Sequence, residues 1–121
     1  MPAKKILIVD DSATDRQYLL EALIPHGYEC ITAKDGAEGV VKAKAEKPDL
    51  ILMDIVMPGM DGFNATRAIT HDDATKHIPV IICTSKGRET DRLWGMRQGA
   101  KDYLVKPINA KELLAKIAAA S

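Results

Sequence analysis

The chain has 121 residues, of which 46% are hydrophobic, enough for one globular domain with a single core but too few for two. Its 17 basic and 17 acidic residues balance, so the sequence has neither the basic field of a nucleic-acid-binding protein nor an acidic tail. The apolar stretch behind the N-terminal lysines is too short for a signal peptide, and no stretch approaches the ~20 apolar residues of a membrane span. We therefore expect one domain over residues 1–121, in the cytoplasm, with no membrane or nucleic-acid partner.

Short apolar runs along the chain predict five β-strands. Several runs are apolar at every position, as in Ile6–Val9 and Leu50–Met53, which is typical of strands buried inside a parallel sheet. Cys30 and Cys83 fall within two of these runs, and we interpret them as buried, reduced thiols. The expected strands lie near residues 5–9, 29–33, 49–54, 79–84 and 102–106.

Helical patterns alternate with these strands. Three helix starts fit a capping box, in which two side chains satisfy free backbone amides of the first turn: Ser12–Asp15, Asp35–Glu38 and Asn109–Glu112. A third helix is expected after Asp61-Gly62, and a fourth over about residues 89–98, ending at Gly99.

Five alternating strand–helix units predict an α/β fold, a doubly wound parallel sheet with helices on both faces. We expect the flavodoxin-like strand order 2-1-3-4-5, taken by analogy with known sheets of this class. In that order strands 1 and 3 are neighbours at the point where the chain direction across the sheet reverses.

Polar residues follow four of the expected strands. Asp10 and Asp11 end the first, Asp54 the third, Thr84 the fourth and Lys106 the fifth. Ligands bind at this edge of open parallel sheets. Two carboxylates ~4 Å apart repel by about 4 kcal/mol at an effective dielectric of ~20, so the cluster favours a hard cation such as Mg²⁺, with Mn²⁺ or Ca²⁺ as alternatives.

An open Mg²⁺ site beside a hydroxyl and an ammonium is suited to a phosphoryl group. Asp54 ends the central strand, and we predict that it accepts the group as an aspartyl phosphate. Mg²⁺ and Lys106 would neutralise the charge that develops during transfer, and Thr84 would donate a hydrogen bond to a phosphoryl oxygen.

These residues resemble the receiver domains of bacterial two-component response regulators, also called CheY-like domains. The resemblance covers essentially the whole chain and rests on four segments: Asp10-Asp11-Ser12, Asp54 to Gly62, Thr84-Ser85 and Lys106-Pro107. It implies phosphorylation of Asp54 by a histidine kinase in a phosphorelay, and a cis peptide at Lys106-Pro107. It also implies a Mg²⁺ site formed by Asp11, Asp54 and the Val56 carbonyl, with Asp10 acting through water.

The resemblance further implies a switch in which Thr84 moves toward the phosphoryl group and Tyr103 follows. Tyr103 as simple packing on an edge strand is the alternative. Trp94 lies at the margin of its helix's apolar stripe, so it either packs at the rim of the core or contacts a partner. The segments Arg92–Leu104 and Met53–Gly59 are also similar to the stand-alone PilG/PilH-type regulators of type IV pilus twitching motility.

We therefore expect a signalling switch that acts through protein partners: a histidine kinase, which could be CheA-like, and a downstream target. No output domain is expected within residues 1–121, although the chain could be a fragment of a longer DNA-binding regulator. A receiver that is never phosphorylated is a further alternative. An aspartate-nucleophile, Mg²⁺-dependent phosphohydrolase needs a second aspartate two residues after the nucleophile, where this chain has Val56. We therefore expect no enzymatic turnover beyond self-phosphorylation and self-dephosphorylation.

Overall fold

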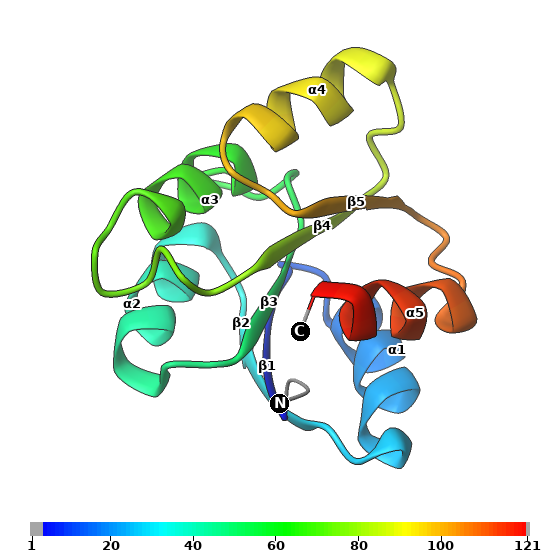
Figure 1. Cartoon of the computed structure of the whole chain (residues 1–121). Helices are drawn as coiled ribbons and strands as arrows, with labels where there is room; N and C mark the ends of the chain where they lie inside the picture. The colour runs from blue at the N-terminus through cyan, green and yellow to red at the C-terminus, as the bar shows by residue number, and fades with distance from the viewer. Residues whose placement is uncertain (1–3, 121) are drawn as a thin grey trace.

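The five apolar runs form one parallel sheet with the strand order 2-1-3-4-5, which confirms the expected topology (Figure 1). This computed structural model describes residues 4–120. Each strand lies within one residue of its predicted bounds at either end. The strands are β1 (Lys5–Val9), β2 (Glu29–Ala33), β3 (Leu50–Met53), β4 (Val80–Thr84) and β5 (Asp102–Val105).

Helices cover both faces of the sheet (Figure 1). On one face, the first and last helices pack against the strands with four buried side chains: Leu19, Leu23, Leu113 and Ile117. The helices are α1 (Ala13–Leu23), α2 (Gly36–Glu46), α3 (Gly62–Thr70), α4 (Glu89–Arg97) and α5 (Ala110–Ala120), with a short 3-10 helix η1 (Ile24–His26) after α1.

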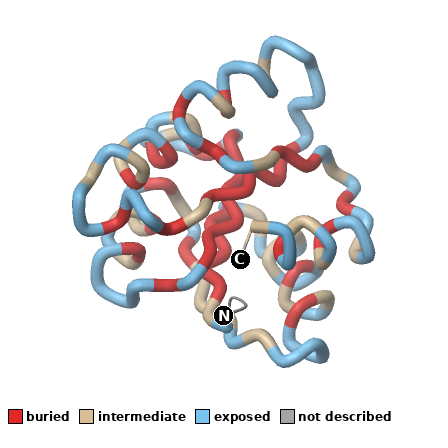
Figure 2. Tube along the Cα trace, in the orientation of Figure 1, coloured by how far each residue is buried: buried red, intermediate tan, exposed pale blue. Residues whose placement is uncertain are grey.

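The opposite face is covered by α2 and α3, which contribute Ala43, Ala65 and Ile69 to a second apolar cluster. Figure 2 shows the consequence, a continuous buried zone along the central strands with exposed helix surfaces outside it. β1 and β3 are buried at nearly every residue because helices cover them on both sides. The continuous apolar runs in the sequence therefore reflect burial on two faces.

α4 is less firmly embedded than the other helices. Gly95 is its only buried residue, and Figure 1 shows the helix standing away from the rest of the molecule. A Cβ atom at Gly95 would lie 2.7 Å from Ile82 Cδ1 and 3.2 Å from the Tyr103 ring. The glycine therefore allows α4 to approach β4 and β5 closely enough to cover Tyr103.

The predicted helix starts are confirmed in one half of each capping box. Ser12 Oγ, Asp35 Oδ1 and Asn109 Oδ1 accept hydrogen bonds from the backbone amides three residues later. Asp15 was expected to return the bond with its side chain, and this part of the prediction is wrong because its carboxylate contacts Lys106 instead. Gly99 has a φ of 106° and follows α4 as predicted. Among residues 4–120, none of the helices combines the length and apolar character needed to cross a bilayer.

Candidate functional site

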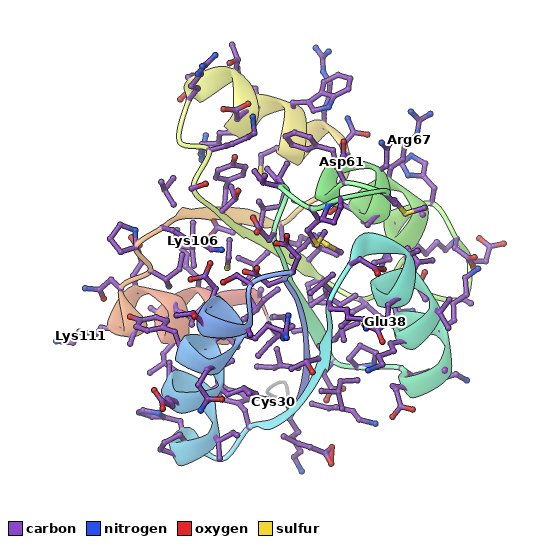
Figure 3. All side chains as sticks on the ribbon, turned by 180° about the vertical axis from the view of Figure 1, so that it is seen from behind. Cys30, Glu38, Asp61, Arg67, Lys106 and Lys111 are labelled. Carbon is purple, nitrogen blue, oxygen red and sulfur yellow. The ribbon has the colours of Figure 1, made fainter. Side chains whose placement is uncertain are left out.

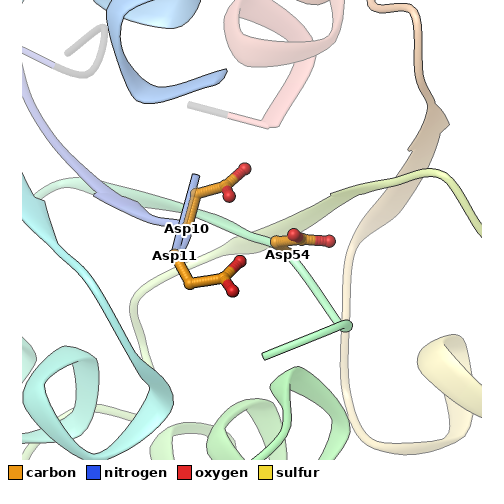
Figure 4. Close-up of side chains that lie close together, drawn as sticks. All are labelled: Asp10, Asp11 and Asp54. Atoms are coloured by element: carbon orange, nitrogen blue, oxygen red, sulfur yellow. The ribbon is translucent and has the colours of Figure 1, made fainter. Parts of the chain in front are cut away.

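The strand register brings the aspartates at the ends of β1 and β3 side by side. Val9 pairs with Met53, so Asp10 and Asp54 occupy equivalent positions one residue further along. The Asp54 amide donates to the Val9 carbonyl at 2.9 Å, which continues the ladder to the end of both strands. Figure 4 shows Asp10, Asp11 and Asp54 close together at this edge, as the sequence predicted.

Asp54 is a buried carboxylate held by the backbone that follows it. Its Oδ1 accepts hydrogen bonds from the amides of Ile55 at 2.8 Å and Val56 at 3.4 Å. Its side chain is only 7% exposed, and Oδ2 lies 3.5 Å from Lys106 Nζ. Backbone donors therefore hold one oxygen, whereas the other faces the cluster.

Asp10 is even more deeply buried, with 1% of the residue exposed. Its Oδ1 accepts from the Ser12 amide at 2.9 Å, and its Oδ2 lies 2.8 Å from Lys106 Nζ. Burial raises the pKa of Asp10 because it disfavours the charged form; the hydrogen bonds from Lys106 and Ser12 act in the opposite direction. The negative charge of Asp54 adds to the rise.

Lys106 follows β5. Among the described residues, it is the one lysine whose ammonium contacts Asp10 and Asp54. Its Nζ contacts three carboxylates: Asp15 at 2.7 Å, Asp10 at 2.8 Å and Asp54 at 3.5 Å. Burial by itself would lower the pKa of this lysine, but the hydrogen bonds to Asp10 and Asp15 outweigh burial and raise the pKa. The lysine therefore stays protonated and offsets part of the negative charge. The peptide Lys106-Pro107 is cis, as the resemblance implied.

Asp15 is the member of this cluster that sequence reasoning missed. It was interpreted as a helix-capping residue, yet its carboxylate makes the shortest contact to Lys106. Figure 3 shows Lys106 near the start of α1. The first turn of α1 follows β1 directly, so an acidic residue there lies at the same edge of the sheet as Asp10 and Asp11. The position of Asp15 in the turn directly after β1 was therefore the sequence feature that could have identified it as a member of the cluster. Arg16, which donates from Nη1 to the Asp10 carbonyl at 2.7 Å, was also missed.

Thr84 and Tyr103 lie on the adjacent strands β4 and β5. Thr84 ends β4 and is fully buried. Tyr103 is 7% exposed, and its hydroxyl donates to the Lys86 carbonyl at 2.6 Å, in the segment between β4 and α4. Burial raises the pKa of Tyr103 to about 12, with the negative charges of Asp91 and Asp54 contributing. Tyr103 thus joins the edge strand to the segment that follows Thr84.

The segment after β3 brings a glycine against the backbone of Asp54. A Cβ atom at Gly62 would lie 1.9 Å from the Asp54 carbonyl oxygen, so no larger residue fits there without moving the chain. Val56 lies in this segment with 49% of its surface exposed. An exposed apolar side chain therefore stands two residues after Asp54, where the sequence placed it.

Trp94 lies away from this cluster, on the outer side of α4. It is 48% exposed, and its ring meets that of Phe63 edge to face with centroids 6.5 Å apart. Packing at the rim of the core and contact with a partner both remain open for Trp94, since its ring contacts Phe63 of α3 while about half of the residue is exposed. The three histidines are exposed, in line with the absence of metal-ligand spacing in the sequence.

The three aspartates fit a hard divalent cation. Asp10, Asp11 and Asp54 each offer an oxygen, and these atoms lie within 4.8 Å of one another. Asp11 is exposed while the other two are buried, so the group has one open side. Oxygen ligands with an open side suit Mg²⁺, which usually binds one or two carboxylates and retains water.

Comparison with solved structures finds the same architecture in chemotaxis proteins. The CheY4 protein of Vibrio cholerae superposes with a TM-score of 0.91 at 34% identity, covering 98% of this chain and 99% of that one. A chain of the CheX-CheY-BeF3-Mg+2 complex from Borrelia burgdorferi superposes with a TM-score of 0.90 at 33% identity, covering 96% of this chain and 87% of that one.

Sequence comparison agrees. Protein PilH of Pseudomonas aeruginosa is 54% identical over 113 residues, 93% of each chain. The phosphate regulon transcriptional regulatory protein PhoB of the same species is 40% identical, but this chain spans only 52% of it. Residues 6–118 match the response regulator receiver domain. Aspartates at the ends of β1 and β3, the 2-1-3-4-5 sheet and these matches lead to one assignment: the chain belongs to the response regulator receiver domain family.

Proposed function

We propose that Asp54 is the phosphoacceptor of this receiver and that Asp10, Asp11, Asp54 and the Val56 carbonyl form its Mg²⁺ site. The observation that carries the proposal is the convergence of three carboxylates and one ammonium at the carboxyl edge of the sheet. The receiver family acts in two-component signalling. Bound Mg²⁺, or Mn²⁺ in its place, would supply positive charge to offset the oxygens of a phosphoryl group.

The geometry of Asp54 suits it to nucleophilic attack on phosphorus. Because backbone amides engage Oδ1, we assign the attack to Oδ2. An Oδ2–phosphorus bond forms as the bond from phosphorus to the donor breaks, and the electron pair leaves with the donor's imidazole nitrogen or acyl oxygen. Lys106 already lies 3.5 Å from Oδ2, close enough to reach the transferred group by a small movement.

Thr84 and Tyr103 carry the signal from the acceptor to the surface in this proposal. Thr84 moves toward the phosphoryl group, and Tyr103 moves further into the space that Thr84 leaves. The hydroxyl of Tyr103 is bonded to the segment between β4 and α4, so its movement is coupled to α4. A population shift from 1:99 to 99:1 requires about 5.5 kcal/mol, and each charge-assisted hydrogen bond contributes roughly 1.5–3 kcal/mol.

We further propose that the partners are a histidine kinase, which could be CheA-like, and a downstream protein bound through Tyr103, Trp94 and the neighbouring surface. The likeness to PilH over 93% of both chains supports a role in type IV pilus twitching or a related chemotaxis-like motility system. We place the protein in the cytoplasm, where such kinases present their phosphohistidine, and assign residues 1–121 to one receiver domain.

Incubation with Mg²⁺ and acetyl phosphate, followed by intact-mass analysis, tests the chemistry. We expect one added phosphoryl group in the wild type and none in Asp54→Asn. Asp73→Asn, which removes an acid that is almost fully exposed in the loop before β4, is the matched control and should be modified like the wild type. Addition that survives in Asp54→Asn would assign the acceptor to another residue.

The same reaction distinguishes the phosphohydrolase alternative. Val56 cannot act as an acid or base two residues after Asp54, so the phosphorylated form should accumulate and outlast an enzymatic turnover. Sustained consumption of acetyl phosphate, with little phosphoprotein present, would instead favour a hydrolase.

A further inference from the structure

Asp15 and Asp54 compete for the same ammonium. Lys106 Nζ lies 2.7 Å from Asp15 Oδ2 but 3.5 Å from Asp54 Oδ2. A lysine ammonium has three N–H donors, and its two short contacts go to Asp15 and Asp10. In this unphosphorylated structure Lys106 is therefore drawn toward α1 and contacts the proposed acceptor only weakly.

The start of α1 leaves the Asp15 carboxylate free for this contact. In a complete capping box the third helical residue would accept a hydrogen bond from the amide of the capping residue. Here the Ser12 amide donates to Asp10 Oδ1 at 2.9 Å instead. Asp15 therefore has no acceptor role within its own helix, and its carboxylate extends to Lys106.

The surroundings allow the pair to separate. The Lys106 side chain is 17% exposed and that of Asp15 is 42% exposed, so water can replace the lysine at Asp15 at modest cost. A groove lined by Asp15, Tyr18, Lys106 and Ile108 runs between α1 and the segment after β5. Asp10 and Asp54, in contrast, are almost fully buried and cannot exchange partners with water so readily.

We propose that Asp15 is a positioning residue that restrains Lys106 in the unphosphorylated protein and thereby slows phosphorylation of Asp54. The inference rests on the proposed roles of Asp54 and Lys106. When a phosphoryl group arrives, Lys106 turns from Asp15 to the new oxygens. Asp15 opposes this movement because it holds one of the ammonium donors of Lys106.

The test compares initial rates of phosphorylation by acetyl phosphate in saturating Mg²⁺. Asp15→Asn should react about two- to fivefold faster than the wild type, the range expected for an ion pair with one exposed partner. Asp15→Glu keeps the charge and should return the rate to near that of the wild type. Glu21→Gln removes an exposed charge six residues further along α1 and should leave the rate unchanged.

A double-mutant cycle and a direct view of the lysine separate the restraint from general electrostatics. In a Lys106→Gln background, Asp15→Asn should change the rate by less than about 1.5-fold, since no ammonium remains to be released. Nuclear magnetic resonance of the Lys106 ammonium protons, without any phosphodonor, should show faster exchange with water in Asp15→Asn than in Asp15→Glu.

Three results would overturn the inference. They are an unchanged or slower phosphorylation rate in Asp15→Asn, the same acceleration by Asp15→Asn in the Lys106→Gln background, or equal exchange of the Lys106 ammonium protons in Asp15→Asn and Asp15→Glu. These outcomes are distinct from failure of the proposed function. If the wild type is phosphorylated at Asp54 but Asp15→Asn does not change the rate, only the proposed restraint of Lys106 by Asp15 is overturned. A wild type that is not phosphorylated at Asp54 would overturn both proposals.

Discussion

Asp11→Asn should stabilise the protein without Mg²⁺ and should abolish most of the stabilisation that Mg²⁺ provides. Asp11 is exposed, and no hydrogen bond or ion pair of its side chain is found among the described residues. The substitution therefore removes one negative charge at nearly constant shape. Its effect on stability should report the repulsion within the aspartate cluster.

The magnitude follows from the separation of the three carboxylates. At the 4.8 Å limit, two unit charges repel by about 0.9 kcal/mol in water and about 3.5 kcal/mol at an effective dielectric of 20. The exposure of Asp11 favours the lower value for each of its two neighbours, and the Lys106 charge offsets part of the sum. We expect Asp11→Asn to raise the free energy of unfolding by about 1–2 kcal/mol in a chelator.

Mg²⁺ should reverse this order. A cation at 100 times its Kd stabilises the wild type by about 2.7 kcal/mol, whereas a hundredfold loss of affinity leaves the variant about 0.4 kcal/mol at the same concentration. The wild type then becomes the more stable protein.

Urea denaturation followed by circular dichroism, with chelator and with Mg²⁺, measures both quantities. Glu21→Gln is the control for a charge removed elsewhere and should show neither effect. Lower stability of Asp11→Asn in chelator, or equal stabilisation of both proteins by Mg²⁺, would refute the shared cation site.

Two further predictions concern the backbone after the acceptor and the buried tyrosine. Gly62→Ala should lower the free energy of unfolding by about 3 kcal/mol or more because its Cβ would collide with the Asp54 carbonyl; Asn64→Ala, exposed in the same helix, should change it by less than ~1 kcal/mol in urea denaturation. Tyr103 should ionise near pH 12 in a spectrophotometric titration, a step that is missing in Tyr103→Phe. Because folding raises this pKa above its usual value of 10, the contribution of Tyr103 to stability is intact below pH 10 and is lost as the pH rises through about 12. Ionisation of Tyr103 near pH 10 would show that the ring is not buried in solution.

The strands and helices of this protein, and the chemical character of its site, could be predicted from local sequence patterns. Apolar runs predicted all five strands within one residue because strands covered on both faces, such as β3, need apolar side chains at every position. Helix starts could also be predicted, because capping is a contact between residues three positions apart in the sequence. Asp10, Asp54 and Lys106 stood out because a charged residue directly after a buried strand lies at the edge of the sheet.

Which of these residues are in contact depends on how distant segments of the chain pack together. The strand order was predicted only by analogy with known sheets, because no local sequence pattern indicates which strands become neighbours. The strand order depends on the packing of the whole sheet. The contact between Asp15 and Lys106 joins residues 91 positions apart. It also depends on the hydrogen bond that the Ser12 amide donates to Asp10, which leaves the Asp15 carboxylate without that donor. Sequence spacing does not reveal which of the two carboxylates accepts from Ser12. The burial of Tyr103 likewise depends on α4 approaching closely at Gly95, a contact between distant segments that only the folded chain creates.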